Sequence, residues 1–466
     1  MLPITRREML SRAGTGLGTL GLASVLSDAG LLAAAPAAIA PGRNPLAPKS
    51  THFPARAKRI IHLFMNGGPS HVDTFDYKPS LEKYNGQKPP TSATKTERVT
   101  GSTLMMSPFK FARHGRCGLN VSEIFPNVAK CADDLCVINS MHTNIPNHEP
   151  SLLMMTCGDN QPIRPSMGSW LLYGLGAENQ NLPGFVVFCP GKPVVGPQLW
   201  ANSFLPGIFQ GAHINNSSLD PKSVIPHLHN GSLTRAAQRE QLDLLKQLNE
   251  MHLAQRSGDN PLEARIQSLE MAFRMQFEAQ DVFDLSKETQ STRDLYGKGQ
   301  FGEACLLSRR LLERGVRMVQ IFTGGGQPWD DHGDATAHAA KAKLVDQPIA
   351  ALLTDLKRTG MLDDTLVLWG GEFGRTPTAQ GAKGRDHHSQ GFTVWLAGGG
   401  VKGGMTYGAT DEFGIAAVEK RTHVHDLHAT MLHLMGLDHE KLTYRYGGRD
   451  FRLTDVHGKI VHDIIA

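Results

Sequence analysis

Short apolar runs recur along the chain and alternate with longer stretches of helical periodicity. Six of these runs lack polar alternation, at residues 59–65, 135–141, 185–188, 316–322, 365–370 and 392–398. Continuous apolar runs of this length are typical of strands that are buried on both faces of a mostly parallel sheet. The pattern therefore predicts an α/β fold, in which helices cover both faces of a central sheet.

The helical stretches have apolar residues three and four positions apart. Residues 335–359 place Ile349 and Leu352 on one face and end at Gly360, as expected for an amphipathic helix with a glycine stop. Residues 232–315 are helical throughout in this pattern, so we predict a helical insertion there.

The last two apolar runs are joined by a polar connection that contains Gly, Pro and Thr but no helical periodicity. A parallel return normally needs a crossover of about a dozen or more residues, usually helical. We therefore predict that residues 392–397 run antiparallel to residues 365–369, which gives the sheet at least one antiparallel strand.

The N-terminus has the features of an export signal. Arg6 and Arg7 precede a stretch rich in Gly, Ala and Leu, and small residues follow. This start is similar to the twin-arginine type, so we expect removal of residues 1–37, a folded domain over residues 55–466, and a periplasmic or cell-surface protein. The apolar stretch is interrupted by Asp28 and falls short of the roughly 20 residues that span a bilayer, so no stable membrane span is expected after cleavage.

The composition of the chain excludes one class of partner. The 48 Lys and Arg nearly balance the 44 Asp and Glu, for a formal net charge of +4, and no basic block is interleaved with aromatic residues. A protein that follows a phosphate backbone needs such a block, so nucleic acid is not an expected partner.

Four polar clusters each follow a predicted strand, at residues 66–76, 142–150, 329–334 and 370–375. Ligands of open parallel sheets bind outside the carboxyl ends of the strands, so these clusters should meet at one edge. The candidate metal ligands are Asp330, His332, Glu372, Asp386 and His387, and the further polar residues at this edge are Asn66, Ser70, His71, Asp73 and Asn147.

Carboxylate oxygen and imidazole nitrogen are common ligands of divalent metals in proteins. A single Asp or His in a loop is more often a turn residue or a satisfied polar group. Their repetition at consecutive strand ends nevertheless favours a site for a divalent ion, Zn, Mn, Mg or Ca. Asn147 has a second interpretation, because residues 146–148 would serve equally well as the start of an Asn-capped helix.

Several motifs resemble known families. Residues 352–375 and 422–437 are similar to the metal-loop region and the late helix of the alkaline phosphatase and sulfatase superfamily. More closely, GGPSHVDTFDYKP, WDDHGD, GEFGRTP, GRDHH and GGRDFRLTDVHGKIVHDII resemble the DUF1501 family of exported bacterial proteins, which is common in planctomycetes. The resemblance implies an alkaline phosphatase-like fold and a site with two metals.

Position by position, the resemblance implies that Asp330 and His332 bind one metal and that His387 completes the site. Two positions depart from the superfamily pattern. Glu372 and Phe373 stand where an Asp-His pair is usual. Asn66 stands where an Asp ligand is usual, and Asp73 is a candidate replacement. Both departures concern residues that would bind the second metal.

The nucleophile is the other departure. The sulfatase signature C/S-x-P-x-R is absent from the sequence, which disfavours a formylglycine sulfatase. TNIPNHEPSLLMMTCG resembles the nucleophile turn of related phosphodiesterases, which implies Thr143 or Asn144 as the nucleophile and adds His148 as a catalytic candidate. A water activated by the metal would serve as well. Arg375 or His388 would steady the charged oxygens.

Two functions are consistent with these features. The first is an exported metal-dependent hydrolase of phosphate or sulfate esters, acting on a small molecule or a polysaccharide. The second is a non-catalytic exported binding protein that keeps the fold but has lost part of the metal site and the nucleophile. The departures at Asn66 and Phe373 favour the second, and the remaining acid and imidazole clusters favour the first.

Overall fold

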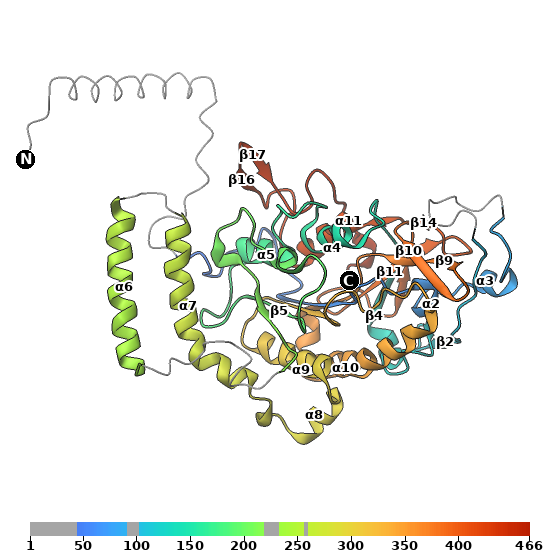
Figure 1. Cartoon of the computed structure of the whole chain (residues 1–466), viewed down its shortest axis with the longest axis horizontal. Helices are drawn as coiled ribbons and strands as arrows, with labels where there is room; N and C mark the ends of the chain where they lie inside the picture. Colours follow the sequence, from blue (N-terminus) through green and yellow to red (C-terminus); the bar gives the residue numbers. More distant parts are fainter. Residues whose placement is uncertain (1–43, 91–101, 219–232, 256–259) are drawn as a thin grey trace, which may run out of the picture. The chain divides into compact units, whose positions relative to one another are not determined.

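A nine-stranded sheet forms the centre of the protein (Figure 1). The computed structural model describes residues 44–90, 102–218, 233–255 and 260–466, so the predicted export signal, residues 1–37, lies outside the described residues. Across the sheet the strands follow the order β12 (Met405–Tyr407), β4 (Leu135–His142), β11 (Phe392–Ala397), β8 (Thr365–Gly370), β1 (Arg59–Phe64), β7 (Met318–Phe322), β5 (Phe185–Phe188) and β6 (Ala212–Ile214), and β15 (Thr422–His423) also pairs with β4.

One strand of this sheet runs against the others. β11 pairs antiparallel with β8, where Trp395 lies opposite Trp369, and antiparallel with β4. The other pairings of the described strands in this sheet are parallel. The predicted fold class is therefore confirmed, and so is the antiparallel direction of residues 392–397 relative to residues 365–369.

The connection between β8 and β11 contains a hairpin instead of a crossover helix. Its strands are β9 (Gly374–Gln380) and β10 (Gly384–His388), which pair antiparallel. Because the hairpin leaves and returns at the same edge of the sheet, the polar residues on it stay at the carboxyl ends of the parallel strands. This arrangement gives the second half of the hairpin access to residues that follow β4 and β7.

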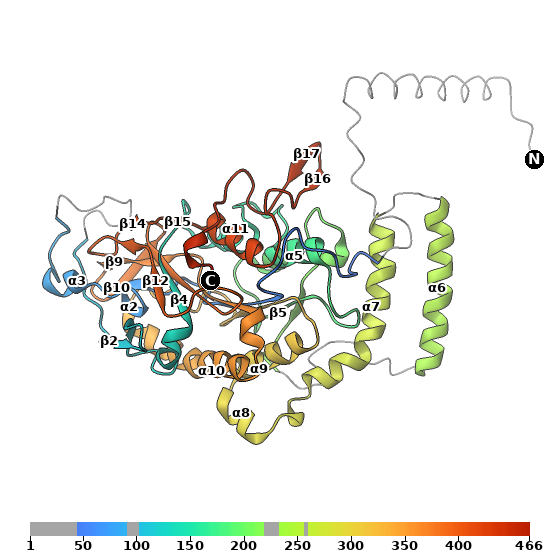
Figure 2. The same ribbon diagram turned by 180° about the vertical axis from the view of Figure 1, so that it is seen from behind.

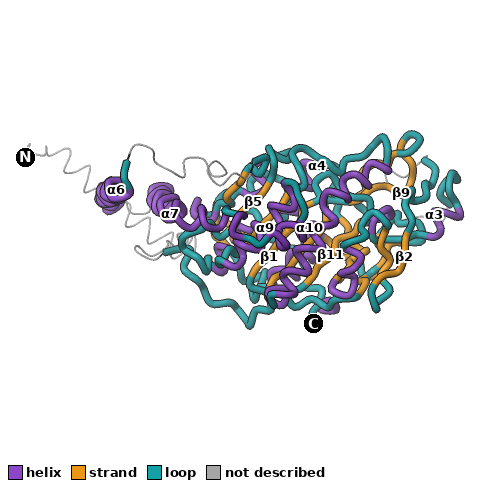
Figure 3. Tube along the Cα trace, turned by 90° about the horizontal axis from the view of Figure 1, so that it is seen from below, coloured by secondary structure: helices purple, strands orange, loops and turns teal. Residues whose placement is uncertain are grey.

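Alternate residues of each strand face different helical layers. Ile61 and Leu63 of β1 belong to a large buried apolar cluster that also contains residues of several helices. His62 faces the other side, where it lines a small cavity together with Met155 and His428. The helices of the first side are α9 (Gln300–Glu313) and α10 (His338–Arg358), and those of the second are α4 (His148–Cys157), α5 (Met167–Leu175) and α11 (Val424–Leu434) (Figures 2 and 3).

The remaining elements lie outside the central sheet. They are the helices α2 (His71–Thr74), α3 (Pro79–Lys83), α6 (Arg235–Gln255), α7 (Asn260–Phe283) and α8 (Gln290–Tyr296), and the two-stranded hairpins β2 (Phe111–His114) with β3 (Leu119–Ser122) and β13 (Ala409–Thr410) with β14 (Ala417–Glu419). Short 3-10 helices cover Val128–Asp134, Gly196–Trp200, Gly207–Phe209, Leu285–Lys287, Ala335–Ala337, Met361–Asp364 and His462–Ile464. None of the described helices combines the length and hydropathy needed to cross a bilayer.

The predicted helical insertion, residues 232–315, corresponds to α6, α7, α8 and α9 in its described part. Its last helix, α9, packs into the apolar cluster on the sheet. Residues Thr443–Phe451 belong to a separate compact unit. They contain the antiparallel hairpin of β16 (Tyr444–Tyr446) and β17 (Arg449–Phe451).

Candidate metal centre

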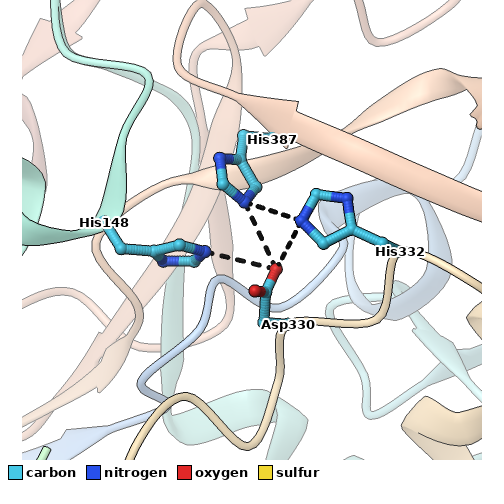
Figure 4. Close-up of side chains that lie close together, drawn as sticks. All are labelled: His148, Asp330, His332 and His387. Carbon is cyan, nitrogen blue, oxygen red and sulfur yellow. Dashed lines mark hydrogen bonds and ion pairs between the residues drawn. The ribbon is translucent and has the colours of Figure 1, made fainter. Parts of the chain in front are cut away.

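Four polar side chains from three separate segments converge at the carboxyl ends of the parallel strands (Figure 4). Asp330 and His332 follow β7, His387 lies on β10, and His148 is the first residue of α4, after β4. Each offers one ligand atom, and these atoms all lie within 4.8 Å of one another. The structure therefore brings together three of the predicted ligands and one residue that was predicted as catalytic.

Asp330 lies at the centre of this group. Its Oδ1 lies 3.2 Å from Nε2 of His148, 2.9 Å from Nε2 of His332 and 3.3 Å from Nε2 of His387. The Nε2 atoms of His332 and His387 are themselves 2.9 Å apart. Three imidazole nitrogens and one carboxylate oxygen thus face a common point.

The opposite nitrogen of each imidazole is held by an oxygen. Nδ1 of His148 lies 2.6 Å from Oε1 of Glu372, and Nδ1 of His387 lies 3.0 Å from the carbonyl oxygen of Pro146. Nδ1 of His332 lies 2.5 Å from Oε1 of Gln380. Because these oxygens accept hydrogen bonds, Nδ1 of each ring can donate to them, which directs each Nε2 towards Asp330.

These features fit a divalent cation. Three imidazole nitrogens this close to a carboxylate need protons or a metal ion between them. Imidazole nitrogen and carboxylate oxygen are ligands of Zn and related metals, and a ligand histidine usually donates its other N–H to an oxygen. His148, Asp330, His332 and His387 are therefore the residues that would hold the ion.

Arg375 supports Asp330 from behind. Its Nη2 donates to Oδ1 of Asp330 at 2.6 Å and to the carbonyl of Gly67, and its Nε donates to the carbonyl of Gly68 at 2.9 Å. The guanidinium is fully buried, and this burial lowers the pKa of Arg375. In this position Arg375 fixes the carboxylate, and its Nη1 has no hydrogen-bond partner among the described residues.

The charges around the centre favour a cation. Burial acts to raise the pKa of Asp330, but hydrogen bonds with His148 and His387 and the charge of Arg375 outweigh burial and hold that pKa well below its usual range. Burial lowers the pKa of His387. Burial also acts to lower the pKa of His148, but hydrogen bonds with Asp330 and Glu372 outweigh it and raise that pKa. Protons will therefore compete with a metal first at His148.

Glu372 takes a different place from the one predicted. Its buried carboxylate accepts from the backbone N–H of Gly67 at 3.0 Å as well as from His148, so it orients a ligand and is not among the four converging residues. Phe373 has its ring 4.8 Å from that of His148 and 4.9 Å from that of His387. The aromatic side chain thus packs against two of the converging imidazoles.

A glycine permits the loops to meet. Gly67 has φ of +112°, and a Cβ atom there would lie 2.7 Å from the backbone nitrogens of Trp329 and Asp330. Any side chain would therefore push the Asp330 loop away from the loop after β1. The GG motif of the sequence is explained by this close approach.

Two other predicted ligands lie outside the converging group. Oδ1 of Asp386 accepts from the backbone N–H of His387 at 2.7 Å and lies 3.9 Å from Nδ1 of His332, so it borders the site. Asp73 is bound by Arg385 through two hydrogen bonds of 2.7 and 3.0 Å, and both side chains are buried. Asp73 therefore does not replace the missing aspartate at position 66.

Asn66 itself is fully engaged by the loop after β7. Its Nδ2 donates to the carbonyls of Gly324 and Gly326 at 2.9 and 2.8 Å, and its Oδ1 accepts from the N–H and hydroxyl of Thr323. An asparagine with these four bonds organises the loop that precedes Asp330. It has no oxygen left for a second metal.

His388 and His71 lie in the interior behind the hairpin. Their rings stack at 5.9 Å, and Nε2 of each donates to a carbonyl, of Ile415 and Gly414 respectively. Burial lowers the pKa of His388 to about 3 and that of His71 to about 4. His388 is thus a neutral core residue, which corrects its predicted contact with charged oxygens.

The remaining candidates, Ser70, Asn147 and Thr143, follow β1 and β4 in the chain. The N–H of Ser70 donates to Nε2 of His338 at 3.1 Å. Asn147 occupies the N-cap position of α4 through its backbone, without a side-chain cap bond. Thr143 donates its N–H to Ser389 at 2.9 Å, and its buried hydroxyl has no hydrogen-bond partner among the described residues.

Comparison with known proteins assigns the family. Residues 57–465 match the family described as "Protein of unknown function (DUF1501)", and a search of the curated proteins finds no match. Similar solved structures include the lipoteichoic acid synthase LtaP from Listeria monocytogenes, at 9% identity and a TM-score of 0.36, covering 88% of this chain and 78% of that chain.

Two further structures show similarity of the same order. The PsFucS1 sulfatase from Pseudoalteromonas sp. is 12% identical with a TM-score of 0.35, covering 83% of this chain and 69% of that chain. A protein in the alkaline phosphatase superfamily from Vibrio parahaemolyticus is 10% identical with a TM-score of 0.34, covering 84% and 70%. At these TM-scores the superpositions carry no argument about activity, so the site is interpreted from its own residues.

Proposed function

The chain belongs to the DUF1501 family, and from its site we propose that it is an exported metal-dependent hydrolase of phosphate or sulfate esters. The observation that carries the proposal is the convergence of three Nε2 atoms on Asp330, with each Nδ1 already bound to an oxygen. Such an arrangement is preorganised for a metal ion. The ester class follows from the motif resemblance of residues 352–375 to the alkaline phosphatase and sulfatase superfamily.

When bound, a divalent ion would polarise the ester oxygen and lower the pKa of an attacking hydroxyl or water. Glu372 and Gln380 hold the imidazoles in the tautomer that leaves Nε2 free, and Arg375 holds Asp330. The side chain of His332 is 37% exposed, so a substrate can approach the centre from its side. A small-molecule ester or an ester group on a polysaccharide would fit this exposed edge.

Thr143 remains the proposed nucleophile, with water as the alternative. Its hydroxyl is buried without a described partner, which leaves it available for a bound group. Replacing Thr143 with Ala and with Ser separates the two cases. Activity lost in Thr143→Ala and retained in Thr143→Ser supports the threonine, and activity retained in both supports water.

A second function is favoured by a specific observation. Four protein ligands complete a tetrahedral shell, which is typical of structural metal sites, whereas catalytic sites keep an open position. The hydrogen bonds of Asn66 also leave that residue unable to hold a second ion. We therefore keep as the alternative a non-catalytic exported binding protein that retains the fold but has lost part of the metal site and the nucleophile.

One experiment separates these functions. The mature protein, beginning near residue 38, is stripped with a chelator, reloaded with Zn, Mn, Mg or Ca, and assayed on p-nitrophenyl phosphate and p-nitrophenyl sulfate. We expect metal-dependent release of p-nitrophenol that is lost in His332→Ala and retained in His462→Ala, an exposed histidine far along the chain. Absence of hydrolysis of either ester would support the binding protein, and failure to bind any of the four metals would refute the hydrolase.

Export is proposed from the sequence alone. Replacing Arg6 and Arg7 with Lys should leave the precursor in the cytoplasm if the twin-arginine route is used. Normal export of that variant would assign the segment to another route.

A further inference from the structure

Exposed apolar side chains concentrate on α6. Of the twelve large apolar residues that are exposed in the described chain, four lie on this helix. Leu244, Leu248 and Met251 are exposed by 59%, 54% and 64%, and Leu245 by 38%. Single exposed apolar residues are common on soluble proteins, but several on one face mark an interaction surface.

The opposite side of α6 already has a partner. The Arg239 guanidinium makes two hydrogen bonds to Glu270 of α7, at 2.7 and 3.0 Å, and lies 4.9 Å from the ring centre of Phe273. Figure 3 shows α6 and α7 side by side. At about 100° per residue, Leu248 lies on the side of α6 opposite to Arg239. The exposed leucines are therefore not the face that packs on α7.

The exposed face has the spacing of a helix-pairing seam. Gln241, Leu244, Leu248 and Met251 are separated by three, four and three residues, which are the a and d positions of a heptad repeat. We call these four residues the α6 stripe. Such a stripe buries its apolar atoms by packing against a second helix.

We propose that the α6 stripe pairs with the α6 stripe of a second copy of this chain, antiparallel, about a twofold axis near Lys246. In this arrangement Leu244 of one copy faces Leu248 of the other, and Gln241 faces Met251. This register brings the leucines of both copies together at the centre, with one Gln241–Met251 pair at each end, so the apolar centres of the two stripes coincide. A twofold interface of this kind is closed and forms a dimer.

The charges of α6 agree with self-pairing. The helix carries three cations, Arg235, Arg239 and Lys246, and three anions, Glu240, Asp243 and Glu250, so its formal charge is 3 − 3 = 0 and none of these residues is on the stripe. Two copies therefore meet without net repulsion, and antiparallel packing places opposite ends of the helix dipoles together. A membrane-surface helix would instead carry an excess of Lys and Arg on its polar face.

The dimer is independent of the proposed hydrolase function, because the α6 stripe contains no residue of the metal centre. Sedimentation velocity of the mature protein over a concentration series tests it. We expect a dimer that dissociates on dilution. In the double variant Leu244→Glu, Leu248→Glu the dissociation constant should rise about 100-fold or more, because each stripe would then bury charges without partners.

Lys246→Glu is the matched control, since it changes charge on the same helix away from the stripe and should retain the dimer. Metal content and circular dichroism report whether each variant is folded. A wild-type protein that is monomeric at every concentration would overturn the proposal. So would a folded double variant that dimerises normally, and so would wild-type monomers that bind phosphatidylglycerol vesicles through the stripe.

The register has its own test. In a Cys117→Ser background, which removes the exposed free thiol, Leu244→Cys protein is mixed with Leu248→Cys protein and oxidised mildly. Antiparallel pairing predicts that the mixed disulfide forms faster than either variant cross-links with itself. Faster self-linking of each variant would indicate a parallel pair and overturn the proposed arrangement.

Discussion

Glu372 contacts the metal centre through His148. Its Oε1 lies 2.6 Å from Nδ1 of His148, whose Nε2 lies 3.2 Å from Asp330. The carboxylate is buried and also bound to the N–H of Gly67, so it is held in one position. It can therefore set the tautomer and direction of the imidazole without touching the ion.

The first prediction follows from this relationship. Glu372→Ala should weaken metal affinity by about 10- to 100-fold, the usual effect of removing a group that orients a ligand. Removing a converging residue itself, as in His148→Ala, should weaken affinity further. Competition with a chromogenic chelator measures both constants.

The matched control is Glu149→Ala, an exposed carboxylate one residue from His148. It should leave metal affinity unchanged. If Glu372→Ala bound metal as tightly as the wild type, the orienting role of Glu372 would be wrong.

The second prediction concerns the close approach at Gly67. Gly67→Ala introduces a Cβ 2.7 Å from the backbone nitrogens of Trp329 and Asp330, at φ of +112°. We expect lower thermal stability and a large loss of metal affinity, because the Asp330 loop must move. Calorimetry and metal titration report the two effects separately.

Gly381→Ala is the control for backbone strain alone. Gly381 has φ of +62°, and a Cβ atom there would have no neighbouring atom within 4 Å, so the substitution should cost only about 1–2 kcal/mol. Metal affinity should be unchanged in this variant. Equal loss of metal in both variants would mean that the contact with Asp330 is not the cause.

Much of this fold could be predicted from local patterns in the sequence. Continuous apolar runs identify the buried strands, and the Gly-rich connection without helical periodicity correctly indicates that β11 is antiparallel. Asp330, His332 and His387 were recognisable as candidate ligands because they lie in polar loops that border strands at the same edge. These inferences use only neighbours in the chain.

The parts of the site that could not be predicted depend on distant contacts. Arg385 forms an ion pair with Asp73, although the two residues are 312 positions apart in the sequence. No local pattern shows that the charge of this carboxylate is neutralised. The sequence also cannot show which nitrogen of His148 faces the centre. Gln380 was missed because an uncharged residue on a hairpin gives no signal until His332 is seen beside it.

The third prediction tests the buried pair of Asp73 and Arg385. Desolvation acts to raise the pKa of Asp73, but the charge of Arg385 and the hydrogen bonds from Arg385 and Ser70 together outweigh it and lower that pKa. Asp73→Asn leaves a buried guanidinium without its counter-ion, which should reduce the free energy of unfolding by about 3–5 kcal/mol. Urea denaturation of the metal-free protein measures the change.

The double variant Asp73→Leu, Arg385→Met should be less destabilised than Asp73→Asn, because no charge is left buried. Asp463→Asn breaks the exposed ion pair with Lys420 and should change stability little. A double variant that is less stable than the single variant would contradict the argument.

The fourth prediction concerns pH. Burial lowers the pKa of His62, His388 and His428 to about 3, whereas the same residues titrate near 6.5 in the unfolded chain. Between these two values the unfolded state binds more protons than the folded state. The stability that these residues contribute is therefore complete above about pH 6.5 and is lost as the pH falls towards 3, by at most about 1.4 kcal/mol per pH unit for each histidine.

His428→Gln isolates one of these residues. Nε2 of His428 donates to the carbonyl of Met155 at 2.9 Å, and the glutamine amide can donate to the same oxygen but does not titrate. We expect the loss of unfolding free energy between about pH 7 and about pH 5.5 to be smaller in this variant by about 1 kcal/mol. Denaturation of metal-free protein at both values measures this difference, and an identical pH dependence in wild type and variant would show that the pKa of His428 is the same in the folded and unfolded chain.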